Sequence, residues 1–354
     1  MKVALVYDRV NKWGGAERIL LALHDIFPKA DVYTSVYNRQ KAPWAKDLNI
    51  KTSFLQKLPL ASSSHEFLPV LMPLAFESFN FDTYDLVISL TSEAAKGIIT
   101  KPSTKHICIC LTPTRYLWSG YEEYFKSPLF RFLSLSAVWY LRYWDKIASQ
   151  RPDKYLAISN AVKTRIKKYY GRDADLIPLP LALLPTKKIT NGDYYLLVSR
   201  LVYYKRVDLA VKVFNKLNLP LKIIGIGSQS NTLKAIANNN IEFLGEVSEE
   251  MLADYYASCK GLIFPGNEDF GLVMVEAQSY GKPVLAFRSG GALDIVREGK
   301  TGDFFDEQSQ TSLEKAMEKF KNKRYNTKLC RSNALRFSFA NFKNSLLKEI
   351  DLNL

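Results

Sequence analysis

Two glutamates separated by seven residues, Glu268 and Glu276, lie in a stretch whose pattern predicts a strand, a loop, a helix and a second strand. The apolar run Leu262–Phe264 ends in a Pro-Gly pair that stops a strand, and apolar residues recur at helical spacing over Leu272–Tyr280. The first turn of such a helix presents free N–H groups and a partial positive charge, which suit a phosphate. A carboxylate beside that site suits the vicinal hydroxyls of a ribose. The pattern therefore predicts one acid for each of two sugars, with a diphosphate between them.

A plainer interpretation of the same two acids stays open at this point. Glu268 could cap the helix, and Glu276 could be a solvated helix residue. If the helix begins near Gly271, Glu276 lies about 7 Å further along its axis. Because helical side chains lean toward the N-terminus, its carboxylate could still reach back toward the anion.

The stretch Pro265–Val284 (PGNEDFGLVMVEAQSYGKPV) resembles the E-x7-E signature of the retaining GT-B glycosyltransferases, in particular of family GT4. The Phe-Gly pair, the Glu-Ala pair and the Gly-Lys-Pro-Val sequence of that signature are all in place. The resemblance implies a nucleotide-sugar donor, with Glu276 on the ribose and Glu268 on the donor sugar. It also implies that backbone amides cover the diphosphate, from Phe270, Gly271, Leu272 and Val273.

A second group of candidate residues, Arg200 and Lys205, lies in the sequence SRLVYYKRVD. A guanidinium and an ammonium are the usual pair for a phosphate, but two basic residues alone mean little in a chain this basic. Their S-R-x4-K spacing resembles the diphosphate-binding step of GT4 enzymes. The resemblance implies that Arg200, Lys205 and the helix start stabilise the departing diphosphate, and that Glu268 completes the catalytic set.

The expected helix at 16–26 follows Gly14 and Gly15, where a side chain would block the close approach of a ligand. A tight turn between a strand and a helix would also explain this glycine pair. The sequence WGGAE resembles the glycine loop of GT4 enzymes, which faces the interdomain cleft. That resemblance makes Gly14 and Gly15 candidate donor-binding residues.

The stretch Lys105–Trp118 (KHICICLTPTRYLW) resembles the H-T-P-x-R-Y stretch of mannosyltransferase-like GT4 proteins, but Leu111 stands where those proteins usually carry histidine. In the family that histidine contacts the donor sugar near its C6 hydroxyl. A leucine cannot hydrogen-bond, and a buried unpaired hydroxyl costs roughly 1–3 kcal/mol. We therefore consider a 6-deoxyhexose donor, whose methyl group suits Leu111. The alternative is that another residue or a water molecule takes over the contact.

Alternating strands and helices occur in two series and predict an α/β protein with parallel sheets. With the resemblance, this predicts the GT-B fold, in which two Rossmann-like domains face each other across a cleft. The expected parts are an acceptor-side domain at 1–182, a linker at 183–193, a donor-binding domain at 194–330, and C-terminal helices at 331–354 that cross back to the first domain.

The chain has 354 residues and a net charge of +14, which points to nucleic acid, an anionic membrane or anionic substrates as partners. Aromatic and basic residues alternate over Tyr121–Tyr155, a composition that suits a membrane interface, although a core-packed helix with a basic rim would also explain it. The run Phe132–Leu141 is too short to span a bilayer, and no signal peptide is recognised. Four cysteines without a C-x-x-C pair indicate a reducing compartment and no zinc site. We expect a cytoplasmic protein in peripheral contact with the anionic inner face of the plasma membrane, and no nucleic-acid partner.

The predicted function is a retaining hexosyltransferase of polysaccharide or lipopolysaccharide synthesis. It would move a hexose or 6-deoxyhexose from a nucleotide diphosphate sugar, GDP-linked by resemblance, to a lipid-linked or saccharide acceptor. We expect no metal or other cofactor, because basic groups already neutralise the diphosphate. The single D-x-D sequence, Asp173 to Asp175, is interpreted as a surface pair. The alternatives are a sugar-nucleotide epimerase and a catalytically impaired GT-B scaffold that binds membranes or polyanions.

Overall fold

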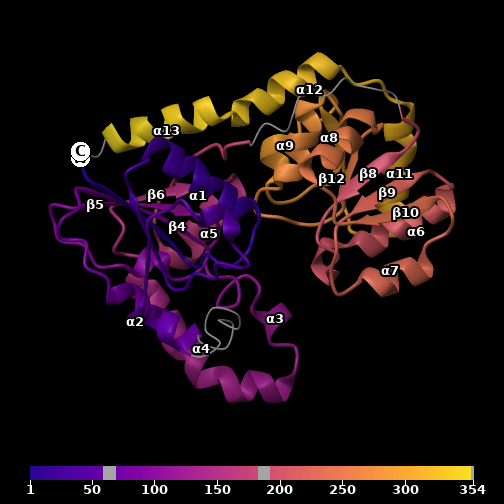
Figure 1. Ribbon diagram of the computed structural model, residues 1–354. Coiled ribbons are helices and arrows are strands. Elements are labelled where there is room, and N and C mark those ends of the chain that lie inside the picture. The colour runs from indigo at the N-terminus through magenta and orange to yellow at the C-terminus, as the bar shows by residue number, and fades with distance from the viewer. Residues whose placement is uncertain (59–68, 182–191, 352–354) are drawn as a thin grey trace. The chain divides into compact units, whose positions relative to one another are not determined.

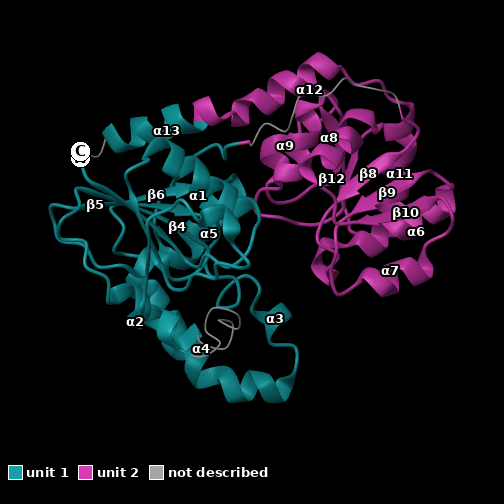
Figure 2. Ribbon diagram, in the orientation of Figure 1, with its two compact units in different colours: residues 1–180, 342–354 teal, residues 181–341 magenta. Residues whose placement is uncertain are grey.

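The computed structural model describes residues 1–58, 69–181 and 192–351 (Figure 1). The chain divides into two compact units, of which the first comprises residues 1–180 with 342–354 and the second residues 181–341 (Figure 2). The predicted linker, 183–193, lies outside the described residues except for its last two positions.

The first unit is built on a seven-stranded parallel sheet whose strands run in the order β3-β2-β1-β4-β5-β6-β7. The central strands β1 and β4 are buried along their whole length, as expected where helices cover both faces of a sheet. The strands are β1 (Val3–Tyr7), β2 (Asp31–Thr34), β3 (Ile50–Thr52), β4 (Leu86–Thr91), β5 (Lys105–Cys110), β6 (Lys154–Ala157) and β7 (Asp175–Leu176). The α-helices are α1 (Gly15–Ile26), α2 (Met72–Glu77), α3 (Tyr121–Tyr124), α4 (Pro128–Ala148), α5 (Asn160–Tyr170) and α13 (Phe339–Asp351).

The second unit is built on a six-stranded parallel sheet in the order β10-β9-β8-β11-β12-β13. Its main apolar core gathers around Phe214 and Tyr195, between the sheet and the helices α6 and α11. The strands are β8 (Tyr195–Val198), β9 (Leu221–Ile224), β10 (Ile241–Gly245), β11 (Leu262–Phe264), β12 (Val284–Phe287) and β13 (Gly302–Phe305). The α-helices are α6 (Val207–Leu217), α7 (Ser230–Ile236), α8 (Glu249–Ser258), α9 (Leu272–Ser279), α10 (Ala292–Ile295), α11 (Gln310–Asn322) and α12 (Thr327–Ala334).

Strand order reverses once in each sheet, between β1 and β4 in the first and between β8 and β11 in the second. In open α/β sheets, ligands bind outside the carboxyl ends of the strands at such a reversal. Each unit is thus a doubly wound, Rossmann-like domain with one position where a ligand site is expected. The predicted α/β class with two Rossmann-like domains is confirmed.

The C-terminal segment 331–354, whose final helix is expected to cross back to the first domain over Phe342–Leu352, is divided between the units. Residues 331–341 are part of the second unit, where the amide of Asn333 donates to Gln278 Oε1 and to the carbonyl of Ile295. Most of α13 belongs to the first unit, where Phe342, Leu346 and Ile350 are buried. An ion pair of 3.2 Å joins Lys154 Nζ of β6 to Glu349 Oε2 of α13.

Candidate active site

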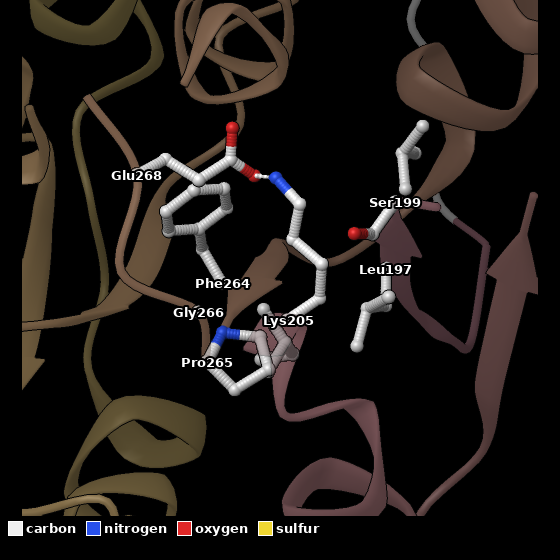
Figure 3. Close-up of a pocket in the computed structure, with 9 residues that line it drawn as sticks. Leu197, Ser199, Lys205, Phe264, Pro265, Gly266 and Glu268 are labelled. Atoms are coloured by element: carbon white, nitrogen blue, oxygen red, sulfur yellow. Dashed lines mark ion pairs between the residues drawn. The ribbon is translucent and has the colours of Figure 1, made fainter. Parts of the chain in front are cut away.

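A pocket lies at the strand reversal of the second sheet, between the ends of β8 and β11 (Figure 3). Backbone turns after both strands form its walls, and two charged side chains reach into it. Its lining residues are Leu197, Val198, Ser199, Lys205, Ile263, Phe264, Pro265, Gly266 and Glu268. The pocket therefore combines two of the predicted catalytic residues with the position that the sheet topology favours for a ligand.

An ion pair between the Lys205 ammonium and the Glu268 carboxylate spans this pocket (Figure 3). Lys205 is 8% exposed, and the Glu268 side chain is about a quarter exposed to solvent. The two residues come from different loops, one before α6 and one before α9. An ammonium and a carboxylate held side by side can serve an anion and a sugar hydroxyl, respectively, when a ligand enters between them.

Arg200 lies on the same loop as Lys205 and is exposed to solvent. Its Nη2 donates a 2.6 Å hydrogen bond to the hydroxyl of Tyr204, and the Lys205 ammonium lies 5.1 Å from the centre of the Tyr204 ring. Tyr204 thus contacts both predicted phosphate-binding cations. Sequence reasoning missed this residue, although an aromatic side chain directly before Lys205 was a signal that could have found it.

The helix α9 begins behind this loop with Gly271 as its N-terminal cap. Gly271 has φ +96°, a backbone conformation that favours glycine, and a Cβ there would lie 2.4 Å from the flexible end of Met274, at Cε. Within the described residues, no side chain caps the start of α9. The interpretation of Glu268 as the cap of this helix is therefore wrong. Leu272 and Val273 occupy the first turn, where the resemblance puts the diphosphate.

Glu276 is buried in the middle of α9, at 3% exposure. Its Oε2 accepts a 2.8 Å hydrogen bond from the hydroxyl of Tyr256 on α8. The ring of Tyr256 stacks on Tyr280, and burial and the charge of Glu276 together raise the pKa of Tyr280. The interpretation of Glu276 as a solvated helix residue is therefore wrong, since its carboxylate is held inside the domain.

The glycine pair after β12 supports the loop that carries Glu268. The amide of Gly291 donates a 2.9 Å hydrogen bond to the carbonyl of Glu268. Gly290 has φ +60°, and a Cβ there would lie 2.1 Å from the same carbonyl oxygen. On the same loop, Phe270 is buried with its ring edge-on to Phe337. The close approach of two backbones fixes the position from which the Glu268 side chain projects.

The other three predicted residues, Gly14, Gly15 and Leu111, belong to the first unit. Gly14 and Gly15 connect the loop after β1 to the start of α1, where a Cβ on Gly14 would lie 3.1 Å from Glu17 Oε2. Leu111 directly follows β5, is half-buried, and donates its amide to the carbonyl of Thr91. Eight predicted residues thus lie in the second unit, where Lys205 and Glu268 meet in the pocket, and three lie at the carboxyl edge of the first sheet.

Each carboxylate of the D-x-D sequence forms an ion pair with a lysine. Asp173 accepts from Lys167 Nζ at 2.9 Å, and Asp175 pairs with Lys154, which lowers the pKa of its carboxyl. Both aspartates are exposed. Across residues 1–58, 69–181 and 192–351, no three His, Cys, Asp or Glu side chains gather in a way that could hold a metal ion.

Comparison with solved structures assigns the fold. HepE of Anabaena, solved with UDP and glucose, aligns over 99% of both chains at a TM-score of 0.69 and 18% identity. A sucrose-phosphate synthase from Thermosynechococcus elongatus aligns over 100% of both chains at a TM-score of 0.74 and 14% identity. The chain has the GT-B fold of these glycosyltransferase structures.

Residues 185–336 match the family model of the glycosyl transferases group 1. The matched stretch contains the pocket described above.

Relatives with curated descriptions are similar to this chain over shorter stretches. An uncharacterised glycosyltransferase of Methanocaldococcus jannaschii is 30% identical over 191 residues, 51% of this chain and 53% of the relative. The D-rhamnosyltransferase WbpZ of Pseudomonas aeruginosa is 27% identical over 45% of each chain. A GDP-mannose-dependent α-mannosyltransferase of Corynebacterium glutamicum is 33% identical over 31% of this chain and 26% of the relative. The chain spans about half or less of the length of these relatives.

Proposed function

We propose that this protein is a retaining glycosyltransferase of the GT4 type that transfers a hexosyl group from a nucleotide diphosphate sugar to a lipid-linked or saccharide acceptor. The observation that carries the proposal is the Lys205–Glu268 ion pair at the strand reversal of the second sheet. It combines a cation for the diphosphate and a carboxylate for the donor sugar in one pocket. The group 1 domain match over the same residues supports it.

In this proposal the cations serve the leaving group. Lys205 exchanges its carboxylate partner for a phosphate oxygen when the donor enters, and the exposed Arg200 closes on the same diphosphate. The first-turn amides of α9, from Leu272 and Val273, add the partial positive charge of a helix start. These groups stabilise the negative charge that develops as the glycosidic bond to the diphosphate breaks.

The two glutamates serve the two sugars. Glu268, released from Lys205, accepts hydrogen bonds from hydroxyls of the donor sugar, and Glu276 accepts from the ribose. The bond to the acceptor forms on the face from which the diphosphate leaves, which retains the anomeric configuration. The leaving phosphate takes the acceptor proton, so catalysis rests on positioning and charge. We propose that no metal is required, because the basic groups neutralise the diphosphate.

A GDP-linked 6-deoxyhexose is the donor that we favour. Two of the similar proteins are described as a GDP-mannose-dependent mannosyltransferase and a D-rhamnosyltransferase, and rhamnose is a 6-deoxyhexose. By the resemblance, Leu111 stands where a histidine meets the 6-hydroxyl of the donor, and a leucine would leave that hydroxyl unpaired. If Leu111→His leaves the preference between GDP-mannose and GDP-rhamnose unchanged, this donor assignment fails.

Nucleotide-dependent thermal stabilisation tests the donor site. The wild type, Glu276→Ala and the exposed control Glu318→Ala on α11 are each heated with GDP, UDP, dTDP or ADP. A nucleotide at a hundred times its dissociation constant adds about 2.7 kcal/mol, which is a clear shift in Tm. We expect GDP to stabilise the wild type and the control equally, and Glu276→Ala much less. The same shift in the presence of a chelator supports metal independence, whereas its loss contradicts it.

The epimerase alternative would need acid–base residues in the first unit. His106 does not suit that role, because it is fully buried and its Nε2 lies 2.8 Å from Ser89 Oγ. Burial, with Arg151 and Arg172 nearby, lowers the pKa of His106 to about 3, so its imidazole stays neutral. We therefore favour the transferase. Release of an epimerised sugar from a nucleotide sugar, without an acceptor, would reverse this preference.

A further inference from the structure

The helix α4 presents a large apolar face to solvent. Its inner side is buried against the first unit through Val138, Leu141 and Trp144. Its outer side carries nine large apolar or aromatic residues that are between 40% and 72% exposed. These are Leu129, Phe130, Phe132, Leu133, Leu135, Trp139, Tyr140, Tyr143 and Ile147. We call this set the α4 outer face. A contiguous exposed surface of this composition marks an interaction site.

The residues of the α4 outer face change in character along the helix axis. The N-terminal half contributes only leucine and phenylalanine, whereas the next turns contribute Trp139, Tyr140 and Tyr143. The rings of Trp139 and Tyr143 stack at 6.0 Å with planes 8° apart. Exposed Lys146 follows them in the last turn. Apart from Ile147 beside Lys146 and from Arg131, which is paired with Glu122, the order runs from apolar residues to amphipathic aromatic residues to a cation, as met from the hydrocarbon of a bilayer outward to its headgroups.

Charge also favours an anionic bilayer over another occupant. The only acidic residue of α4, Asp145, is buried, so the charges that α4 exposes are basic. Arg131 pairs with Glu122 of the preceding helix α3, and Lys126 and Lys146 are exposed lysines near the two ends of α4. The chain as a whole carries +14. Within the described residues, no helix is both long and apolar enough to cross a membrane.

We infer that the α4 outer face docks on an anionic bilayer, with the N-terminal half of α4 deepest and Trp139 and Tyr143 at the headgroup level. This inference rests on the proposed function and narrows it, because it selects a lipid-carried acceptor over a free saccharide.

The preference for a lipid-carried acceptor over a free saccharide follows from how α4 is fixed to the first sheet. The carboxylate of Asp145 accepts from Lys96 Nζ at 2.6 Å, from Thr114 Oγ1 at 3.0 Å and from Trp118 Nε1 at 2.7 Å. Lys96 belongs to the loop after β4, and Thr114 and Trp118 belong to the loop after β5 that begins with Leu111. Docking of α4 therefore holds the carboxyl edge of the first sheet, where the acceptor is expected, at the bilayer surface.

Vesicle flotation with the full chain tests the docking surface. The proteins are the wild type, Leu133→Glu in the α4 outer face, and Leu335→Glu as the control, since the two leucines are 68% and 60% exposed. Vesicles of phosphatidylcholine alone are compared with vesicles of phosphatidylcholine mixed with phosphatidylglycerol. We expect the wild type and the control to float with the anionic vesicles, and Leu133→Glu to partition at least about tenfold less. A wild type that stays with the soluble fraction, or equal flotation of all three proteins, overturns the inference.

Fluorescence resolves the predicted depth. The difference between the wild type and Trp139→Phe isolates the emission of Trp139, which should shift to shorter wavelength on anionic vesicles and be quenched by lipids brominated near the headgroup. Equal quenching by lipids brominated at the chain ends, or no shift at all, contradicts the predicted orientation.

Two further measurements separate this inference from its competitors. If the wild type is dimeric by light scattering without lipid and Leu133→Glu is monomeric, the α4 outer face is a self-association surface and the inference fails. Thermal stabilisation by GDP should be the same in the wild type and in Leu133→Glu. Loss of GDP binding in both proteins with flotation intact would count against the proposed function and leave bilayer docking standing.

Discussion

The hydroxyl of Tyr256 on α8 donates a 2.8 Å hydrogen bond to the buried carboxylate of Glu276 on α9. Tyr256→Phe removes this donor and keeps the ring that stacks on Tyr280. A hydrogen bond to a charged group contributes about 1.5–3 kcal/mol, so we expect the free energy of unfolding to fall by roughly that amount. GDP stabilisation should fall as well, because Glu276 loses its orientation. Urea unfolding with and without GDP measures both effects, and Tyr255→Phe on the same helix is the control.

The Lys205–Glu268 ion pair predicts different effects for its two members. Lys205→Met should weaken GDP binding about 10- to 100-fold, because a charge-assisted contact to phosphate is lost. Glu268→Gln should leave GDP binding within about threefold of the wild type but lower turnover at least 100-fold, because its partner is the sugar. Calorimetric titration with GDP measures the effect on binding, and turnover of the GDP-sugar measures the effect on catalysis. The reverse pattern would mean that Glu268 serves the diphosphate.

Gly290 should tolerate no side chain. Gly290→Ala would press a Cβ onto the Glu268 carbonyl, 2.1 Å away, in addition to the strain of φ +60°. Gly245→Ala is the matched control, since Gly245 has φ +68° and a Cβ there would have no described atom within 4 Å. We expect the control to lose only about 1 kcal/mol of stability and to keep GDP binding. Gly290→Ala should lose GDP binding, and equal binding by both variants would contradict a role for this loop contact.

The buried pair of Lys96 and Asp145 predicts a large stability effect in the first unit. Lys96→Met leaves a buried carboxylate without its cation, which destabilises folded proteins by about 3–5 kcal/mol. The double variant Lys96→Met/Asp145→Leu removes both charges and should recover part of that loss. Chemical denaturation measures the series. If the free energy of unfolding of Lys96→Met lies within about 1 kcal/mol of the wild type, the hydrogen bonds from Thr114 and Trp118 are enough to stabilise the buried Asp145 carboxylate.

His106 predicts a specific pH dependence of stability. Its pKa is about 3 in the folded protein and near 6.5 in the unfolded chain, so the unfolded chain binds more protons between these values. The contribution of the neutral imidazole is complete above about pH 6.5 and is lost as the pH falls toward 3. Compared with His106→Gln, the wild type should lose as much as a few kcal/mol over this range. Parallel free-energy curves for the two proteins between pH 7 and 4 would contradict the low pKa.

The strand–loop–helix–strand unit around Glu268 was predictable because its turn residues and apolar spacing are local. The sequence predicts the strand at Leu262–Phe264 and the strand at Val284–Phe287, and the structure confirms both. The environment of Glu276 was not predictable, because Met274–Gln278 is buried on every side and such a helix shows no solvent face in its pattern. Its partner Tyr256 lies on another helix, and only tertiary packing joins the two.

Apolar runs in the sequence predict strands at 2–8, 31–35, 86–89, 106–111, 154–158, 194–199, 221–226, 241–244, 262–264 and 284–287, and three further strands of the structure were not predicted. β3, β7 and β13 lie at edges of the sheets and span only two to four residues each. β7 is exposed on both residues, so no apolar run marks it. Only one side of an edge strand is paired, and edge strands are therefore often short and polar. A short, polar segment shows no apolar run, so such a strand is hard to recognise in the sequence.

The assignment of α13 to the first unit has a consequence for the order in which a ribosome delivers this chain. Phe342, Leu346 and Ile350 fill their places in the first unit only after the whole of the second unit has been synthesised. The second unit is one continuous stretch and can fold as soon as it has left the ribosome. The first unit leaves the ribosome earlier but cannot complete its fold until its last helix has been synthesised. During that interval the face that α13 covers is exposed, and exposed apolar surface of this kind makes an incomplete chain prone to aggregation.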